Sequence, residues 1–238
     1  MLEIIIIFTV LFFIAVLFYK QANEKIEILQ IQGERIEELP SMYADRSPIV
    51  ITDFQTPFLG TLEEFQKRPN ILQMTVAPNL SLKQLLESSA LEKFQFTQET
   101  AKFLAKESGL TVWFEHHLYE YIIPSYTKWL YSFKTSLWPH HRGLFKTVAF
   151  QTLLMPTEGT AKVHLMLGKV LPYLPTRWEG RSFNSLTAQD TPLIGQIKFI
   201  EITLRRGNFL LLPAHMIVDV TDAWCFIAEI HHPISLLA

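Results

Sequence analysis

Histidine gives this sequence its main capacity for chemistry, and His164 has the neighbours that best suit a binding site. His164 and Met166 are separated by one residue in an apolar run, residues 162–167. On a β-strand this spacing places both side chains on the same face, where they could contact one ligand. A thioether is a soft ligand and suits a hard metal ion poorly. We therefore expect a ligand-binding site without a metal, or a His164 that makes a hydrogen bond in the core.

The other histidines include adjacent pairs, which predict no chelate. Neighbouring residues point to different sides of a helix or a strand, so the two members of a pair do not bind one ion. G-x-S-x-G, H-E-x-x-H, C-x-x-C and Walker motifs do not occur in the sequence, and we nominate no catalytic residue. The pairs are His116-His117, His140-His141 and His231-His232.

Composition excludes several classes of protein. Hydrophobic residues make up 49% of the 238 residues and charged residues 18%, a balance that excludes disorder and allows one substantial core. The net charge of −2 gives no basic field, so we predict no nucleic-acid partner. The single cysteine, Cys225, lies in an apolar run, where we expect a buried side chain rather than a nucleophile.

The N-terminus predicts a transmembrane anchor over residues 2–20. Its apolar run, residues 4–19, would extend about 24 Å as a helix, against a hydrocarbon core of about 30 Å. Glu3 and Lys20 can lengthen the span by reaching toward the two interfaces. A secretory signal peptide is the alternative, but no Lys or Arg precedes the apolar run. The residues expected in the bilayer are Ile4, Phe8, Phe12, Phe13, Phe18, Tyr19 and Lys20.

Positive charge sets the expected orientation. Lys20, Lys25 and Arg35 follow the apolar run, so the positive-inside rule places the rest of the chain in the cytoplasm. We therefore predict a single-pass membrane protein whose partners are the lipid bilayer and an unidentified protein or small molecule. A small anchored protein of this kind would suit a cellular membrane or the inner membrane of a large virus.

Residues 21–40 predict a polar stalk or linker, and residues 41–238 predict one domain. The stalk carries both signs of charge, and Ile26, Ile28 and Ile31 also allow a short strand in place of a helix. The domain divides into a helix-rich part, residues 41–145, and a β-barrel part, residues 146–238.

Local signals identify elements in the helix-rich part. Thr61 and Ser81 each stand three residues before a Glu or Gln, which is the spacing of a capping box, so a short helix is expected after each. Gly109 follows a helical pattern over residues 96–108 and suits a left-handed cap. Strands are expected at residues 48–52 and 71–76.

Aromatic residues crowd together between positions 113 and 145. This zone predicts helices that pack aromatic side chains under a sheet, and an interfacial belt or a stacking surface for a ligand is the alternative. Its central members are Tyr119, Tyr121, Tyr126, Trp129, Tyr131, Phe133 and Trp138.

The second half of the chain predicts a sandwich or barrel. Short apolar or alternating runs are separated by Gly, Pro, Asn and Asp, a pattern typical of many short strands joined by turns. The predicted fold class is therefore α+β, mainly β in the C-terminal half. The expected strands are residues 148–154, 162–167, 194–200, 201–204, 209–212, 216–220 and 224–230.

Residues 207–220, GNFLLLPAHMIVDV, resemble the closing strands of cupin-like domains of the JmjC-related Fe(II)/2-oxoglutarate oxygenase superfamily. They keep the turn at Gly207, the apolar strand after it and Pro213. The resemblance implies a double-stranded β-helix, or jelly-roll, preceded by helices, over roughly residues 30–238. Residues 46–51, 117–130, 152–159 and 201–230 resemble further parts of that fold.

The metal site of that family is incomplete in this chain. The family binds Fe(II) with a His-x-Asp/Glu pair that points into the barrel and a distal His on another strand. By resemblance His164 takes the first position, whereas Met166 replaces the carboxylate and Val218 replaces the distal histidine. Lys169 could bind a carboxylate, as a basic residue does in the family, but it is more typical of a surface lysine. His215 points to the opposite face of a regular strand and would need a bulge to reach the site.

The resulting hypothesis is a non-catalytic cupin-like domain with no metal or cofactor, which acts as a scaffold or binds a protein or small ligand. Its candidate ligand-binding residues are His164, Met166, Lys169 and His215. One alternative is an oxygenase with atypical ligands, in which His164 and His215 bind Fe(II) and 2-oxoglutarate is the co-substrate. Another is a bilayer-surface organising protein that uses its aromatic zone.

Overall fold

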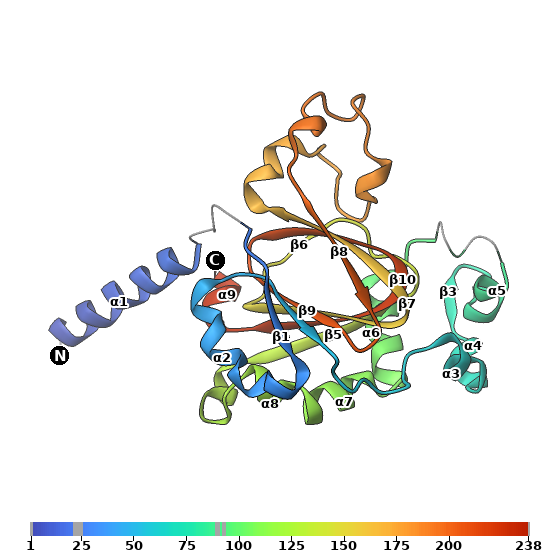
Figure 1. The fold of residues 1–238 in the computed structure, drawn as a ribbon, viewed down its shortest axis with the longest axis horizontal. Coiled ribbons are helices and arrows are strands. Elements are labelled where there is room, and N and C mark those ends of the chain that lie inside the picture. The colour runs from blue at the N-terminus through green and yellow to red at the C-terminus, as the bar shows by residue number, and fades with distance from the viewer. Residues whose placement is uncertain (1, 21–25, 89–90, 92–93, 238) are drawn as a thin grey trace.

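The computed structural model describes residues 2–20, 26–88, 91 and 94–237, and an eight-stranded mixed sheet forms its centre (Figure 1). The strand order is β1-β2-β9-β7-β10-β5, with β8 paired to β7 and β6 paired to β10. The chain is thus α+β, with long strands near its C-terminus. The strands of the sheet are β1 Leu29–Gln32, β2 Ile49–Thr52, β5 Ser132–Trp138, β6 Phe145–Lys146, β7 Gln151–Leu167, β8 Ile200–Arg205, β9 Phe209–Pro213 and β10 Met216–His231.

The two longest strands bend, and each contributes to two layers. The first part of β7 pairs with β9 and its second part with β8. The first part of β10 pairs with β6 and its second part with β5. At the bend Gly159 has a φ of +79°, and a Cβ there would lie 3.3 Å from the carbonyl oxygen of Asp222, so this close approach favours glycine. The smaller layer therefore consists of β8, the second part of β7, the first part of β10 and β6. The larger layer consists of β1, β2, β9, the first part of β7, the second part of β10 and β5.

Helices cover the larger layer next to β5 (Figure 1). Phe114 is fully buried there, with its ring centroid 5.4 Å from that of Phe133 and 6.0 Å from that of Phe226. These contacts join the helices to the main core. The helices of the domain are α2 Leu39–Met42, α3 Leu62–Gln66, α4 Pro69–Leu72, α5 Leu82–Leu86, α6 Gln98–Glu107, α7 Leu110–His117, α8 Tyr119–Ile122 and α9 Pro233–Leu237.

The helix starts predicted at Thr61 and Ser81 and the helix end predicted at Gly109 are confirmed. Thr61 accepts a hydrogen bond from the N–H of Glu64, and Ser81 forms a complete capping box with Gln84. Gly109 follows α6 with a φ of +83°. The strand predicted at residues 71–76 is wrong in its first part, because α4 begins at Pro69 and only β3, Thr75–Ala77, is extended; β3 pairs with β4, Leu80–Ser81.

The segment predicted as a stalk, residues 21–40, contributes β1 to the sheet. β1 pairs in parallel with β2, and Ile31 and Ile36 are buried in the main core. Residues 21–25 lie outside the described residues. The 3₁₀ helices η1 Gly33–Glu38 and η2 Tyr43–Asp45 complete the connection to β2.

Residues 168–199, which we call the cap, stand on the smaller layer (Figure 1). They contain the 3₁₀ helices η5 Gly168–Tyr173, η6 Phe183–Ser185 and η7 Ile194–Gln196. The strand predicted at residues 194–200 is wrong before Ile200, because Ile194 and Ile197 lie three residues apart and both pack into the cluster under the cap. That second cluster comprises Leu144, Met166, Val170, Leu174, Trp178, Leu186, Ile197 and Ile217.

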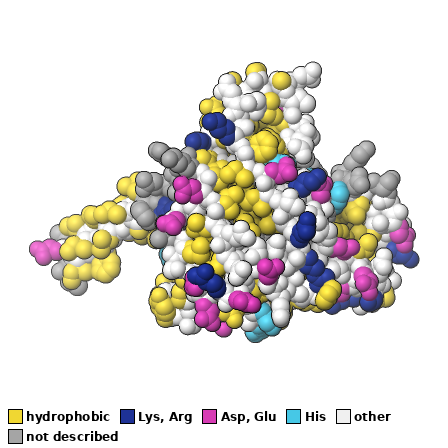
Figure 2. Space-filling model, viewed as in Figure 1, with side chains coloured by type: hydrophobic (Ala, Val, Ile, Leu, Met, Phe, Trp, Pro, Cys, Tyr) yellow, Lys and Arg dark blue, Asp and Glu magenta, His cyan; other side chains and the backbone are white. Residues whose placement is uncertain are grey.

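The predicted transmembrane anchor is wrong. Residues 2–20 do form a helix, α1 Leu2–Lys20, and hydrophobic side chains cover it (Figure 2). Within the described residues, however, the structure contains no helix that is long and apolar enough to cross a membrane. The apolar run of α1 covers only about 24 Å of a hydrocarbon core of about 30 Å. This correction includes the residues assigned to the bilayer: Ile4, Phe8, Phe12, Phe13, Phe18, Tyr19 and Lys20.

The localisation that rested on this span is wrong as well. The sequence predicts a single-pass membrane protein, with the positive charges that follow the apolar run placing its domain in the cytoplasm. A positive-inside argument applies only to a segment that spans, and α1 does not meet that condition.

Candidate functional site

Three polar residues form one row across the smaller layer. His164 on β7 is the direct partner of Asp219 on β10 and of Glu201 on β8. Nδ1 of His164 lies 3.5 Å from Oδ2 of Asp219, and Nε2 lies 3.3 Å from Oε2 of Glu201. The imidazole therefore lies between two carboxylates, one at each ring nitrogen.

The row faces the cap and not the main core. The backbone N–H of Phe183, in the cap, donates a 2.8 Å hydrogen bond to Oδ2 of Asp219. The ring of His164 also contacts Phe183 and Phe199, with centroids 5.5 and 5.3 Å away. His164 and Met166 share a strand face as their spacing predicts, but this face points away from the main core. The alternate positions that belong to the main core are Val163, Leu165, Val218 and Val220.

Burial makes Asp219 the least favourable place for a charge in this row. Its side chain is fully buried, whereas that of Glu201 is half exposed. Burial raises the pKa of Asp219 above its ordinary value, against the opposing effects of the Phe183 N–H and of His164. Burial also lowers the pKa of His141, and the nearby negative charge of Asp219 acts in the opposite direction.

The row does not fit an Fe(II) site. Its two carboxylates lie at opposite edges of one imidazole, so the three side chains do not converge on a common point. The described part of the chain has no group of three or more His, Cys, Asp or Glu residues that could hold a metal ion. His215 lies elsewhere, at the turn between β9 and β10, with a φ of +68°. Its N–H donates a 2.7 Å hydrogen bond to the carbonyl of Thr147.

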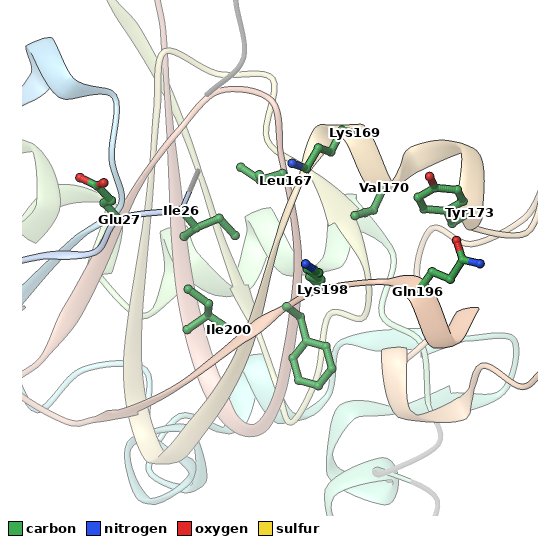
Figure 3. A pocket seen from close by; sticks show the side chains of 10 residues that line it. Ile26, Glu27, Leu167, Lys169, Val170, Tyr173, Gln196, Lys198 and Ile200 are labelled. Atoms are coloured by element: carbon green, nitrogen blue, oxygen red, sulfur yellow. The ribbon is translucent and has the colours of Figure 1, made fainter. Parts of the chain in front are cut away.

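A pocket of about 780 Å³ lies beside this row, between the base of the cap and the segment before β1 (Figure 3). Lys169 and Tyr173 come from η5, and Lys198 comes from the end of the cap. The volume lies within the range of about 300–1,000 Å³ typical of small-molecule sites. The lining residues are Ile26, Glu27, Leu167, Lys169, Val170, Tyr173, Gln196, Lys198, Phe199 and Ile200.

Phe199 connects the pocket to the row. Its ring lines the pocket, is 45% exposed and packs against His164, which is only 2% exposed. Phe183 packs against both rings, with its centroid 5.0 Å from that of Phe199. A molecule in the pocket would therefore touch the ring that separates His164 from the pocket.

The four candidate ligand-binding residues have different surroundings. Lys169 lines the pocket, whereas Met166 is buried in the cluster under the cap. His164 belongs to the carboxylate row, and His215 to a backbone turn that packs against Gly168.

The sequence analysis missed Tyr173, Lys198, Phe199, Glu201 and Asp219. Asp219 had a usable signal, because it is a charged residue inside the apolar run 216–220.

Comparison with known proteins found little. No family model matches the chain, and no curated protein matches it. Among solved structures, the chain is similar to hydroquinone 1,2-dioxygenase from Sphingomonas sp. TTNP3, a crystal structure with 4-hydroxybenzoate bound, at 18% sequence identity and a TM-score of 0.29. The match covers 44% of this chain and 61% of that enzyme. The likeness is weak and partial, and no functional residue is transferred from it.

Proposed function

We propose that this chain is a non-catalytic, cupin-like binding module that holds a small molecule in the pocket at the base of the cap. The observation that carries the proposal is the pocket itself, whose lining combines apolar side chains with a few polar ones. Specific small-molecule sites have this composition, because apolar surface supplies affinity and a few polar groups fix orientation.

The side chains that the smaller layer points into the main core favour binding over catalysis. The side chains of the smaller layer that point into the main core are apolar and buried, and they include Val163, Leu165 and Val218. Val218 is the residue that replaces the distal histidine in the resemblance. Aliphatic side chains supply neither a metal ligand nor a group that transfers protons. The polar residues of the same strands lie on the cap side instead.

No observation favours the two alternative functions. An oxygenase with His164 and His215 as ligands would need a carboxylate that converges with both, and the carboxylates beside His164 lie at opposite edges of its ring. For a bilayer-surface function, most of the aromatic zone is unsuited because it is partly or wholly buried; only Tyr126 and Trp129 are more than three-quarters exposed, at 79% and 81%. Both lie on η4, Ser125–Leu130.

A ligand screen on the full chain tests the proposal. We expect members of a fragment library to bind, as detected by ligand-observed NMR, and Gln196→Trp to abolish their binding by filling the pocket, since Gln196 is exposed and lines it. Gln66→Trp is the matched control, because Gln66 is exposed on α3. The proposal fails if no fragment binds, or if the bound fragments bind equally well to both variants.

A further inference from the structure

The strand β8, which crosses the front of the molecule in Figure 1, has one open edge. Within the described residues β8 pairs with β7 alone, and no strand pairs with its other edge. Outside that ladder, the described backbone gives β8 one further hydrogen bond, from the N–H of Asn208 to the carbonyl of Arg205 at its end. An open edge presents N–H and C=O groups to which another extended segment can bind.

The larger layer continues past this edge. Beyond β7 the larger layer contains β9, β2 and β1, whereas the described part of the smaller layer contains β8 alone. Ile51 on β2 pairs with Phe209, whose ring packs toward the helices. Val50 therefore lies on the side of β2 that faces the smaller layer, where it is half buried, and its β1 partner Gln30 is exposed. One strand added to β8 would lie over this part of β2 and β1, whereas a second copy of the whole chain would collide with them.

The two faces of β8 set the pattern of side chains that would fit beside it. Ile202 and Leu204 face the main core, and Ile202 is only half buried. Glu201, Thr203 and Arg205 alternate with them and are exposed. A strand paired with β8 shares these two faces. Its inward side chains should therefore be apolar, to cover Ile202, and its outward side chains polar.

Charge identifies the partner further. Lys198, shortly before β8, and Arg205, at its end, are exposed, and within the described residues neither has an ion-pair partner. Glu201 lies between them, with its carboxylate 3.3 Å from His164. An acidic residue near each end of the added strand would pair with the two cations and keep its distance from Glu201. Charged side chains deter chance pairing at an open edge, so matching charges would make the pairing selective.

We propose that the open edge of β8 binds an extended segment of a partner protein, in which apolar and polar residues alternate and an acidic residue lies near each end. The segment adds one strand to the smaller layer and covers Ile202 and Val50. Backbone hydrogen bonds supply its affinity, and its acids set the register against Lys198 and Arg205. The inference does not rest on the proposed function, because the edge can bind a segment whether or not the pocket holds a small molecule.

Fluorescence anisotropy of the full chain with labelled, end-capped peptides of eight residues tests the inference, since this length matches residues 198–205. The main probe alternates valine and threonine between two terminal aspartates, and two further probes carry asparagine or lysine at both ends. We expect the aspartate peptide to bind severalfold more tightly than the asparagine peptide, and the lysine peptide to bind most weakly. Methylating the alternate backbone nitrogens that face β8 should abolish binding, and methylating the other set should not.

Matched variants locate the site. Arg205→Gln should reduce the affinity for the aspartate peptide severalfold and leave the affinity for the asparagine peptide unchanged. Lys83→Gln, at an exposed lysine on α5, should change neither affinity.

Several outcomes would overturn the inference. Equal or tighter binding of the lysine peptide would show that charge does not select the partner, and binding that survives both patterns of methylation would show that no strand is added. If the chain forms dimers in sedimentation and Arg205→Gln dissociates them, the edge takes a second copy instead. If none of the peptides binds, β8 is not a docking edge, and the small-molecule pocket stands or fails by its own screen.

Discussion

Asp219 and His164 face each other across β10 and β7, with Oδ2 of the carboxylate 3.5 Å from Nδ1 of the imidazole. The same Oδ2 accepts the N–H of Phe183 from the cap. Asp219 therefore joins two parts of the molecule, the smaller layer of the sheet and the cap that forms most of the pocket. A separation of 3.5 Å is too long for a well-formed hydrogen bond, so the 2.8 Å contact with the Phe183 N–H is the stronger of the two.

Removing the carboxylate should loosen the cap. Asp219→Ala deletes the acceptor of the Phe183 N–H and leaves that group unsatisfied, so we expect the free energy of unfolding to fall by about 1–3 kcal/mol. Amide hydrogen exchange should rise at Phe183 more than in the main core. Asp219→Asn keeps an oxygen acceptor and should protect the Phe183 amide as the native side chain does. Equal exchange at Phe183 in the Ala variant and the native chain would contradict the role of Asp219.

The charge of Asp219 should make stability depend on pH. Burial raises the pKa of Asp219 in the folded state, so the folded chain favours the protonated carboxyl group. The resulting stabilisation is fully present below the pKa of the unfolded chain, 3.8, and is lost as the pH rises through the pKa of the folded chain. Asp219→Asn removes this dependence. The native chain should therefore gain stability relative to Asp219→Asn as the pH falls from 7 toward 3, measured by urea unfolding.

Asp190 provides a control in which stability should change with pH in the opposite direction. A hydrogen bond from Arg181 lowers its pKa below the usual range, and the N–H and hydroxyl of Thr187 act in the same direction. The stabilisation from its ionised carboxylate is present above the pKa of the unfolded chain and is lost as the pH falls through the pKa of the folded chain. The native chain should therefore lose stability relative to Asp190→Asn over the same acidification. The same sign for both residues would show that the burial of Asp219 does not control its ionisation.

Gly168 should tolerate no side chain where β7 passes into the cap. A Cβ at Gly168 would lie 2.5 Å from the carbonyl oxygen of His215, which is backbone and cannot rotate away. We expect Gly168→Ala to lower the free energy of unfolding by about 1–3 kcal/mol through this overpacking. Gly195→Ala, also in the cap, meets no atom within 4 Å and should have little effect. Similar thermal unfolding of the two variants would contradict the close approach at Gly168.

Local elements of this fold could be predicted because their chemistry lies within a few residues. The capping box at Ser81 and Gln84 and the left-handed glycine at position 109 depend on neighbours in the chain, and both are present. The helix at Pro69 is not predicted, because residues 71–76 have the apolar pattern of a strand. Proline also suits the first turn of a helix, which is where Pro69 lies.

The face of His164 could not be predicted from its spacing. Alternation shows that His164 and Met166 share a face, but not which face the main core covers. That choice depends on the cap, whose Phe183 and Phe199 pack on His164 from positions 19 and 35 residues further along the chain. The length of α1 is a different case. The length of its apolar run can be read from the sequence, and flanking residues such as Glu3 and Lys20 do not make up its shortfall against a bilayer.

Phe199 should shield His164 from molecules in the pocket, because its half-exposed ring covers a nearly inaccessible imidazole. We expect Phe199→Ala to open this path and to raise the rate at which diethyl pyrocarbonate modifies His164 severalfold, as read by peptide mass mapping. Phe199→Leu should keep most of the cover. Phe58→Ala removes an exposed ring that lies over Arg206 and should leave the rate unchanged. If His164 stays unmodified in Phe199→Ala while its near-ultraviolet spectrum remains native, other parts of the cap protect it, and Phe199 does not connect the pocket to the row.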